Sequence, residues 1–153
     1  MRVLSVLIIF SAIVLFACSK GKYSTRPSLT LKNVSTYVVP VNGSLDFTFN
    51  FTDKEGDISN LLYVRKIRMN KRAVATIRDS FALPVPQFPN KMYGEIDLNM
   101  DYNNYLVSAS NPPQTGNPPK AENDTLVFKF VLKDKADNKS DTVTTNKIVI
   151  IRQ

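Results

Sequence analysis

Two short segments of the chain carry acidic and amide side chains at close spacing. One runs from Asp53 to Ser59 and the other from Asp134 to Ser140, and each directly follows a run of alternating apolar residues. Calcium binds six to eight hard oxygen ligands, which carboxylates and amide oxygens supply. If the two segments meet in the fold, they predict one structural calcium site. Its candidate ligands are Asp53, Glu55, Asp57, Asp134, Asp137 and Asn138.

The same residue types have a simpler use. Asp, Asn, Gly and Ser form tight turns because their side chains bond locally to the backbone or tolerate unusual dihedral angles. Lys54, Lys135 and Lys139 lie within the two segments and would partly neutralise a cation site. Structural turns and a calcium site are therefore both open interpretations of these segments.

The rest of the composition argues against catalysis. The 153-residue chain has no histidine and one cysteine, so histidine-based triads, Cys–His pairs and histidine-ligated zinc are excluded. Its five glycines are scattered and form no phosphate-binding loop. An enzyme of this composition would have to use a pair of carboxylates, as glycosidases do. We therefore expect a protein that is not an enzyme.

The N-terminal segment predicts export. Arg2 gives a positive start, and Val3 to Ala17 is an apolar run interrupted only by two serines. A run of about 15 residues is shorter than the roughly 20 of a membrane-spanning helix and matches a secretory signal. Its end, Leu15-Phe16-Ala17-Cys18, resembles the lipobox of bacterial lipoproteins, in which an aliphatic and a small residue precede an obligatory cysteine.

This resemblance implies where the protein lies. Residues 1–17 would be removed, and Cys18 would carry a diacylglyceryl thioether and usually an amide-linked acyl chain, which together anchor stably to a lipid bilayer. Residues 18–26 would form the tether and residues 27–153 one domain. Ser19 is not the Asp that resembles an inner-membrane retention signal. We therefore expect an outer-membrane lipoprotein facing the periplasm, with surface display as the alternative.

Beyond the tether, the sequence predicts strands. In the run from Leu45 to Thr52, apolar and polar residues alternate strictly, which is typical of a half-buried strand. Alternation slips near Arg65 and Lys66, which suggests a bulge. The predicted strands are Ser28–Val34, Tyr37–Val41, Leu45–Thr52, Leu61–Met69, Ala73–Ile77, Met92–Met100, Thr125–Lys133 and Val143–Ile151. About seven short strands predict an all-β, immunoglobulin-like two-sheet sandwich, with a small β-barrel as the alternative.

The two acidic segments fit this sandwich. In immunoglobulin-like lettering they are the B–C and F–G loops, which cluster at one end. Both also resemble loops of bacterial immunoglobulin-like and cadherin-like lipoprotein domains, with the patterns Asp-x-Asp/Glu-Gly-Asp and Asp-x-Ala-x-Asn-x-Ser. The first strand begins at the same end, so the tether should leave beside the acidic loops. The long segment from Asp101 to Asp124 should then lie at the opposite end.

These predictions favour display of a binding surface. Polar aromatic residues of the long segment are candidates for partner contact, namely Tyr102, Asn103, Asn104 and Tyr105. The formal net charge of +7 is distributed along the chain, which suits an anionic glycan or a protein as partner and predicts no nucleic acid. We expect a membrane-anchored, non-catalytic binding or adhesion module. The alternatives are a structural accessory of an envelope complex and a carboxylate-based hydrolase.

Overall fold

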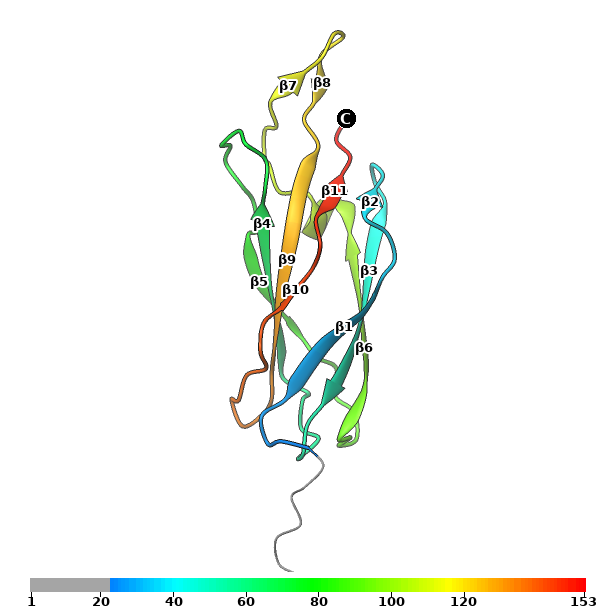
Figure 1. The fold of residues 1–153 in the computed structure, drawn as a ribbon, viewed down its shortest axis with the longest axis vertical. Coiled ribbons are helices and arrows are strands. Elements are labelled where there is room, and N and C mark those ends of the chain that lie inside the picture. Colours follow the sequence, from blue (N-terminus) through cyan, green and yellow to red (C-terminus); the bar gives the residue numbers. More distant parts are fainter. Residues whose placement is uncertain (1–22) are drawn as a thin grey trace, which may run out of the picture.

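The computed structural model describes residues 23–153, which form two facing β-sheets (Figure 1). The elements are β1 (Ser28–Val34), β2 (Val38–Val39), β3 (Ser44–Thr52), β4 (Leu61–Arg68), β5 (Ser80–Pro84), β6 (Tyr93–Asp101), the π-helical turn η1 (Tyr102–Leu106), β7 (Gln114–Thr115), β8 (Lys120–Ala121), β9 (Asp124–Lys133), β10 (Val143–Thr144) and β11 (Ile148–Ile150). The predicted all-β sandwich is confirmed. The export signal and Cys18 lie outside the described residues.

The strand order is that of an immunoglobulin-like sandwich. One sheet has the order β1-β3-β6, and the other has the order β2-β11-β9-β4-β5, with β10 also pairing with β9. In the usual letters these sheets hold strands A, B and E on one side and G, F and C on the other. Strands β7 and β8 form a separate hairpin. The two described sheets end at unpaired edges and do not close on each other, so the β-barrel alternative is wrong.

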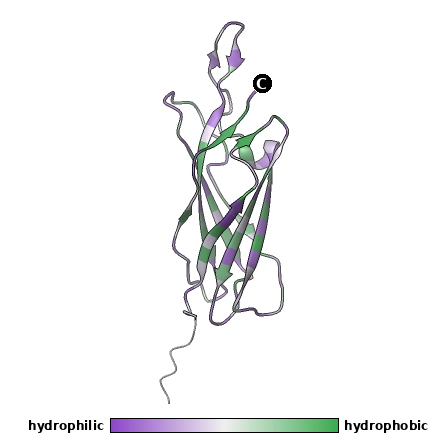
Figure 2. Cartoon of the chain, turned by 45° about the vertical axis from the view of Figure 1, so that its right-hand side comes forward, coloured by the Kyte–Doolittle hydropathy of each residue, from purple (hydrophilic) through white to green (hydrophobic). Residues whose placement is uncertain are grey.

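Phenylalanine fills the space between the sheets. Phe47 and Phe49 on β3 meet Phe128 and Phe130 on β9, and all four side chains are fully buried. The Phe130 ring lies 5.0 Å from that of Phe47 and 4.8 Å from that of Phe49, both edge-on. Such aromatic pairs stabilise a core beyond the area they bury. Hydrophobic and hydrophilic residues alternate along the long strands in Figure 2, as the sequence predicted.

Three sequence predictions about strands are wrong. Strand β4 pairs with β9 without a shift from Leu61 to Arg68, so it has no bulge at Arg65 and Lys66. The predicted strand at 73–77 forms only an isolated bridge, between Thr76 and Ala109. The predicted strand at 143–151 is split into β10 and β11, because the Thr145 hydroxyl takes the hydrogen bond from the backbone N–H of Phe128.

Lys66 explains why the alternation of apolar and polar residues is interrupted in β4 although the strand has no bulge. Its side chain points inward, is 2% exposed, and donates hydrogen bonds from Nζ to the carbonyl oxygens of Tyr105 (2.8 Å) and Val107 (3.0 Å). Burial lowers the pKa of this amine to about 8, while Asp79 and Asp124 oppose that shift. Lys66 therefore occupies a regular core position and ties β4 to η1.

The sandwich has two distinct ends. We call residues 23–27 together with the loops 53–60, 85–92 and 134–142 the tether-proximal end. There the backbone N–H of Lys54 donates to the carbonyl of Ser24 (3.0 Å), and Arg26 pairs with Asp141 (2.6 Å). The C-terminus and the β7–β8 hairpin lie at the opposite, distal end (Figure 1). The described chain thus begins beside the acidic loops, as predicted.

Candidate metal site at the tether-proximal end

Three carboxylates from the two acidic loops converge. One oxygen each from Asp53, Asp57 and Asp134 lies within 4.8 Å of the other two, and Asp53 and Asp134 are buried. Asp53 follows β3 and Asp134 follows β9, so the Phe-rich core fixes the positions of both loops. This buried acidic cluster could hold a metal ion.

The first loop turns back on itself through Gly56. This residue has a positive φ of 69°, and a Cβ there would lie 2.7 Å from the backbone nitrogen of Lys91. Only glycine fits both conditions without strain. The turn returns the backbone N–H of Asp57 to Oδ2 of Asp53 at 3.1 Å. Gly56 thereby brings two carboxylates of the same loop together.

Asn138 and Asn60 fix the third carboxylate. The backbone N–H and side-chain amide of Asn138 donate to the two oxygens of Asp134 at 2.8 and 2.9 Å. The side-chain amide of Asn60 donates to the Asp134 carbonyl at 2.6 Å. Between the loops, the backbone N–H of Lys135 donates to the carbonyl of Asp57 (3.1 Å). The cluster is therefore held from both sheets.

Asp53 is the least satisfied member of the cluster. It is 0% exposed, and its Oδ1 accepts no hydrogen bond from any group in residues 23–153. Burial raises the pKa of Asp53, and the neighbouring Asp57 carboxylate raises it further, although backbone N–H groups oppose these effects. A buried carboxylate oxygen without a partner is costly, and a bound cation would remove that cost.

The remaining predicted ligands do not join the three carboxylates. Glu55 is exposed in the turn, and Asp137 is exposed and pairs with Lys133 at 2.6 Å. That pairing lowers the pKa of Asp137 and raises that of Lys133. Asn138 contacts Asp134 and so supports a ligand. The two predicted loops thus supply the three converging carboxylates, and Glu55, Asp137 and Asn138 lie outside that cluster.

The candidate contact residues of the long segment differ in how far they are exposed to solvent. Tyr102 is only 8% exposed, and its hydroxyl donates to the carbonyl of Ile151 at 2.7 Å, so it belongs to the core and is no contact surface. Tyr105 is half-buried against Phe81 and Arg78. Asn103 and Asn104 are exposed.

Sequence reasoning missed an ionic network at the distal end. Fully buried Asp124 accepts hydrogen bonds from Nε of Arg68 (2.9 Å) and from the backbone N–H groups of Ser108 (3.0 Å) and Ala109 (3.1 Å). Arg152, next to the C-terminus, also pairs with it at 3.3 Å. A carboxylate at the start of a strand gives no sequence signal for such a role.

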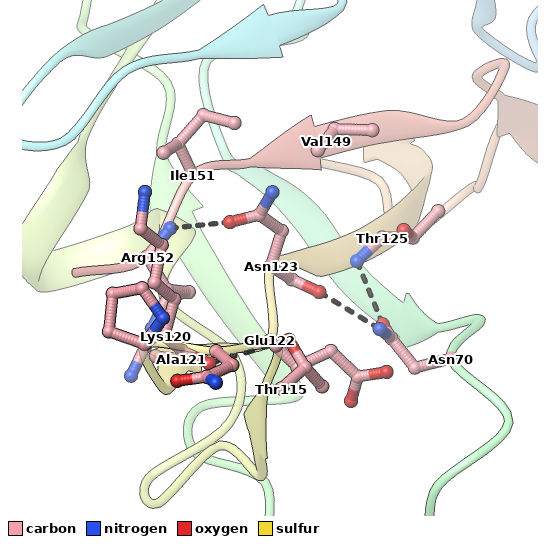
Figure 3. A pocket seen from close by; sticks show the side chains of 13 residues that line it. Asn70, Thr115, Lys120, Ala121, Glu122, Asn123, Thr125, Val149, Ile151 and Arg152 are labelled. Carbon is pink, nitrogen blue, oxygen red and sulfur yellow. Dashed lines mark hydrogen bonds between the residues drawn. The ribbon is translucent and has the colours of Figure 1, made fainter.

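This network adjoins an open pocket of about 890 Å³ beneath the β7–β8 hairpin. Figure 3 shows amide side chains on its wall: Asn70 bonds to the backbone of Asn123 and Thr125, and Asn123 accepts from the N–H of Arg152. Lys120 and Glu122 add both charges to the lining. The pocket is polar and lies at the end of the sandwich opposite residues 23–27.

Comparison with known proteins places the chain in no family: no protein-family model matches it, and no curated protein is significantly similar in sequence. Within residues 23–153, no helix has the length and hydropathy needed to cross a membrane.

Proposed function

We propose that the protein is a lipid-anchored, non-catalytic binding module of the bacterial envelope. Cys18 carries the anchor, the outer membrane holds it on the periplasmic side, and the distal end presents the binding surface to a protein or anionic glycan. The observation that supports this most is that the molecule has two different ends. The described chain starts at one end, while the hairpin and the polar pocket lie at the other.

Anchoring is tested by the intact mass of protein extracted from native membranes. We expect the mass of residues 18–153 plus acyl chains, and a Cys18→Ser variant that lacks this addition and leaves the membrane fraction. Unmodified Cys18 in membrane-extracted protein would refute the anchor.

Partner binding is tested at the rim of the distal pocket. Asn117 and Lys120 are exposed there, so Asn117→Ala with Lys120→Glu should reduce captured partner without loss of folding. The matched control is Lys147→Glu, between β10 and β11, where the lysine is also exposed but lies outside the pocket lining. Equal capture by both variants would favour the alternative of an accessory subunit held through another surface.

Calcium completes the proposal. Asp53, Asp57 and Asp134 offer hard, anionic oxygens, the ligand type that calcium prefers, and neighbouring carbonyls and water can supply the rest of the six to eight. Calcium that binds only the folded state raises its stability by mass action. We expect millimolar calcium to raise the melting temperature relative to chelator. Asp57→Asn should abolish that rise, whereas Asp97→Asn, on β6 and outside the cluster, should retain it.

A further inference from the structure

We propose that the tether-proximal end docks on an anionic bilayer when the acidic cluster holds a divalent cation. This inference rests on the anchoring and calcium proposals above. It adds a second membrane contact, made by the domain itself, and assigns the cation a regulatory role.

The first argument is an exposed apolar patch. Tyr93 and Met92 are 67% and 53% exposed, and they are adjacent in sequence at the start of β6. The ring of Tyr23 lies 6.3 Å from that of Tyr93. Tyrosine is enriched at membrane–water interfaces because its apolar ring and polar hydroxyl suit the headgroup level. Lys54 and Lys91 are exposed at the same end, where their ammonium groups can reach lipid phosphates.

The second argument is distance. Five residue steps separate Cys18 from Tyr23, and an extended chain spans at most about 18 Å over that length. A lipid on Cys18 would therefore keep the patch close to the membrane surface. No other macromolecule is brought so near to this patch by the proposed anchor, which is why we assign the bilayer as its occupant.

The third argument is charge. The tether-proximal end contains five basic residues: Arg26, Lys54, Lys91, Lys135 and Lys139. It contains six acidic residues: Asp53, Glu55, Asp57, Asp134, Asp137 and Asp141. Lys133, at the end of β9, pairs with Asp137 and adds a sixth positive charge beside these loops. The formal charge is therefore 0, and one bound divalent cation changes it to +2. Anionic lipid would attract the second state more strongly than the first.

The cation site and the patch are also joined by the backbone. The N–H of Asp53 donates to the carbonyl of Met92 at 2.8 Å, and the N–H of Lys91 donates to the carbonyl of Gly56 at 3.2 Å. The loop that carries two of the three carboxylates is thus hydrogen-bonded directly to the segment that carries Lys91, Met92 and Tyr93.

The test uses residues 23–153, which contain every strand and the whole hydrophobic core described above. The protein is sedimented with vesicles of phosphatidylethanolamine and phosphatidylglycerol in calcium or in chelator, and with pure phosphatidylcholine vesicles. We expect binding to the anionic vesicles in calcium, a bound fraction lower by on the order of tenfold in chelator, and little binding to phosphatidylcholine.

Variants separate the mechanisms. Met92→Ser with Tyr93→Ser should lose binding. Tyr37→Ser with Val38→Ser, an apolar pair on and beside β2 that is 46% and 55% exposed, should not. Asp57→Asn should lose the effect of calcium, which excludes simple bridging of lipid and protein by free ions. Binding that is equal in calcium and chelator would overturn the charge mechanism.

Three further outcomes would overturn docking. If calcium raises the melting temperature but the domain stays in solution with anionic vesicles, docking is wrong and the calcium site stands. If calcium neither stabilises the domain nor brings it to vesicles, both fall. Calcium-dependent dimers without vesicles, lost in the Met92 and Tyr93 variant, would assign the patch to self-association instead.

Discussion

The buried amine of Lys66 should make the unfolding free energy change with pH in the alkaline range. Its pKa is about 8 in the folded protein because burial disfavours the charged form, against 10.5 for an ordinary lysine. Between these values the unfolded chain binds more protons than the folded chain, so the free energy of unfolding rises with pH. Below pH 8 both states are protonated and this dependence disappears.

The magnitude follows from the two pKa values. Each pKa unit corresponds to about 1.4 kcal/mol, so the full difference in unfolding free energy is about 3 kcal/mol, and most of it is gained between pH 7 and pH 10. Lys66→Met removes the titrating group and also leaves the carbonyls of Tyr105 and Val107 without their donor. The lost hydrogen bonds and the relieved burial of charge oppose each other at pH 7, so we expect a small net change there.

Urea unfolding of both proteins at pH 7, 8.5 and 10 measures the effect. The difference in unfolding free energy, wild type minus Lys66→Met, should grow by about 2 to 3 kcal/mol across this range. Other titrating groups cancel in the difference. Lys129→Met, which removes a half-buried lysine from the solvent side of β9, should follow the wild-type profile. Parallel profiles for wild type and Lys66→Met would show that Lys66 titrates normally and would refute the reasoning.

Three other residues give predictions. Asp124→Ala removes the buried carboxylate that Arg68 shares with Arg152 and with the backbone N–H groups of Ser108 and Ala109, and it leaves Arg68 only its pair with Glu122. It should lower the unfolding free energy by about 3 to 5 kcal/mol in urea titration. Gly56→Ala should lower the unfolding free energy by about 1 to 3 kcal/mol. The loss should exceed that of Gly116→Ala, where φ is also positive but the atom nearest to an added Cβ is 3.6 Å away. Equal losses would contradict the clash with Lys91. In chelator, acidification from neutral pH should stabilise wild type relative to Asp53→Asn, because the folded-state pKa of Asp53 is raised and protonation relieves its burial. Calcium should abolish that trend, and urea unfolding at pH 7 and pH 5 tests both conditions.

The sequence was most informative where one residue pattern had one physical explanation. Strict alternation predicted β3 and β9, and the end at which the described chain begins followed from the direction of the first strand. Alternation failed at Lys66, because a lysine at an inward position looks like a break in the pattern. It also missed β5, which lies in a region of prolines, since Pro84 ends the strand at a sheet edge where a missing N–H is tolerated.

The candidate site was predictable only in part. Loop positions followed from the strand order, so the meeting of Asp53, Asp57 and Asp134 could be predicted. Which residues of a tight turn face inward depends on backbone dihedral angles such as the positive φ of Gly56 and Asp137. These dihedral angles cannot be read from the sequence. Glu55 and Asp137 were therefore counted among the candidate ligands, although they lie outside the cluster.

The parallel pairing of β2 with β11 has a mechanical consequence. Val149 and Ile150 of β11 align with Val38 and Val39 of β2, and the two termini leave the sandwich at opposite ends. A pull between a fixed anchor and a partner held at the distal end would run along the strands. The hydrogen bonds between β2 and β11 would then be loaded in shear and would have to break together, instead of opening one by one. This arrangement would let the domain bear tension between the proposed membrane anchor and a partner bound at the distal end.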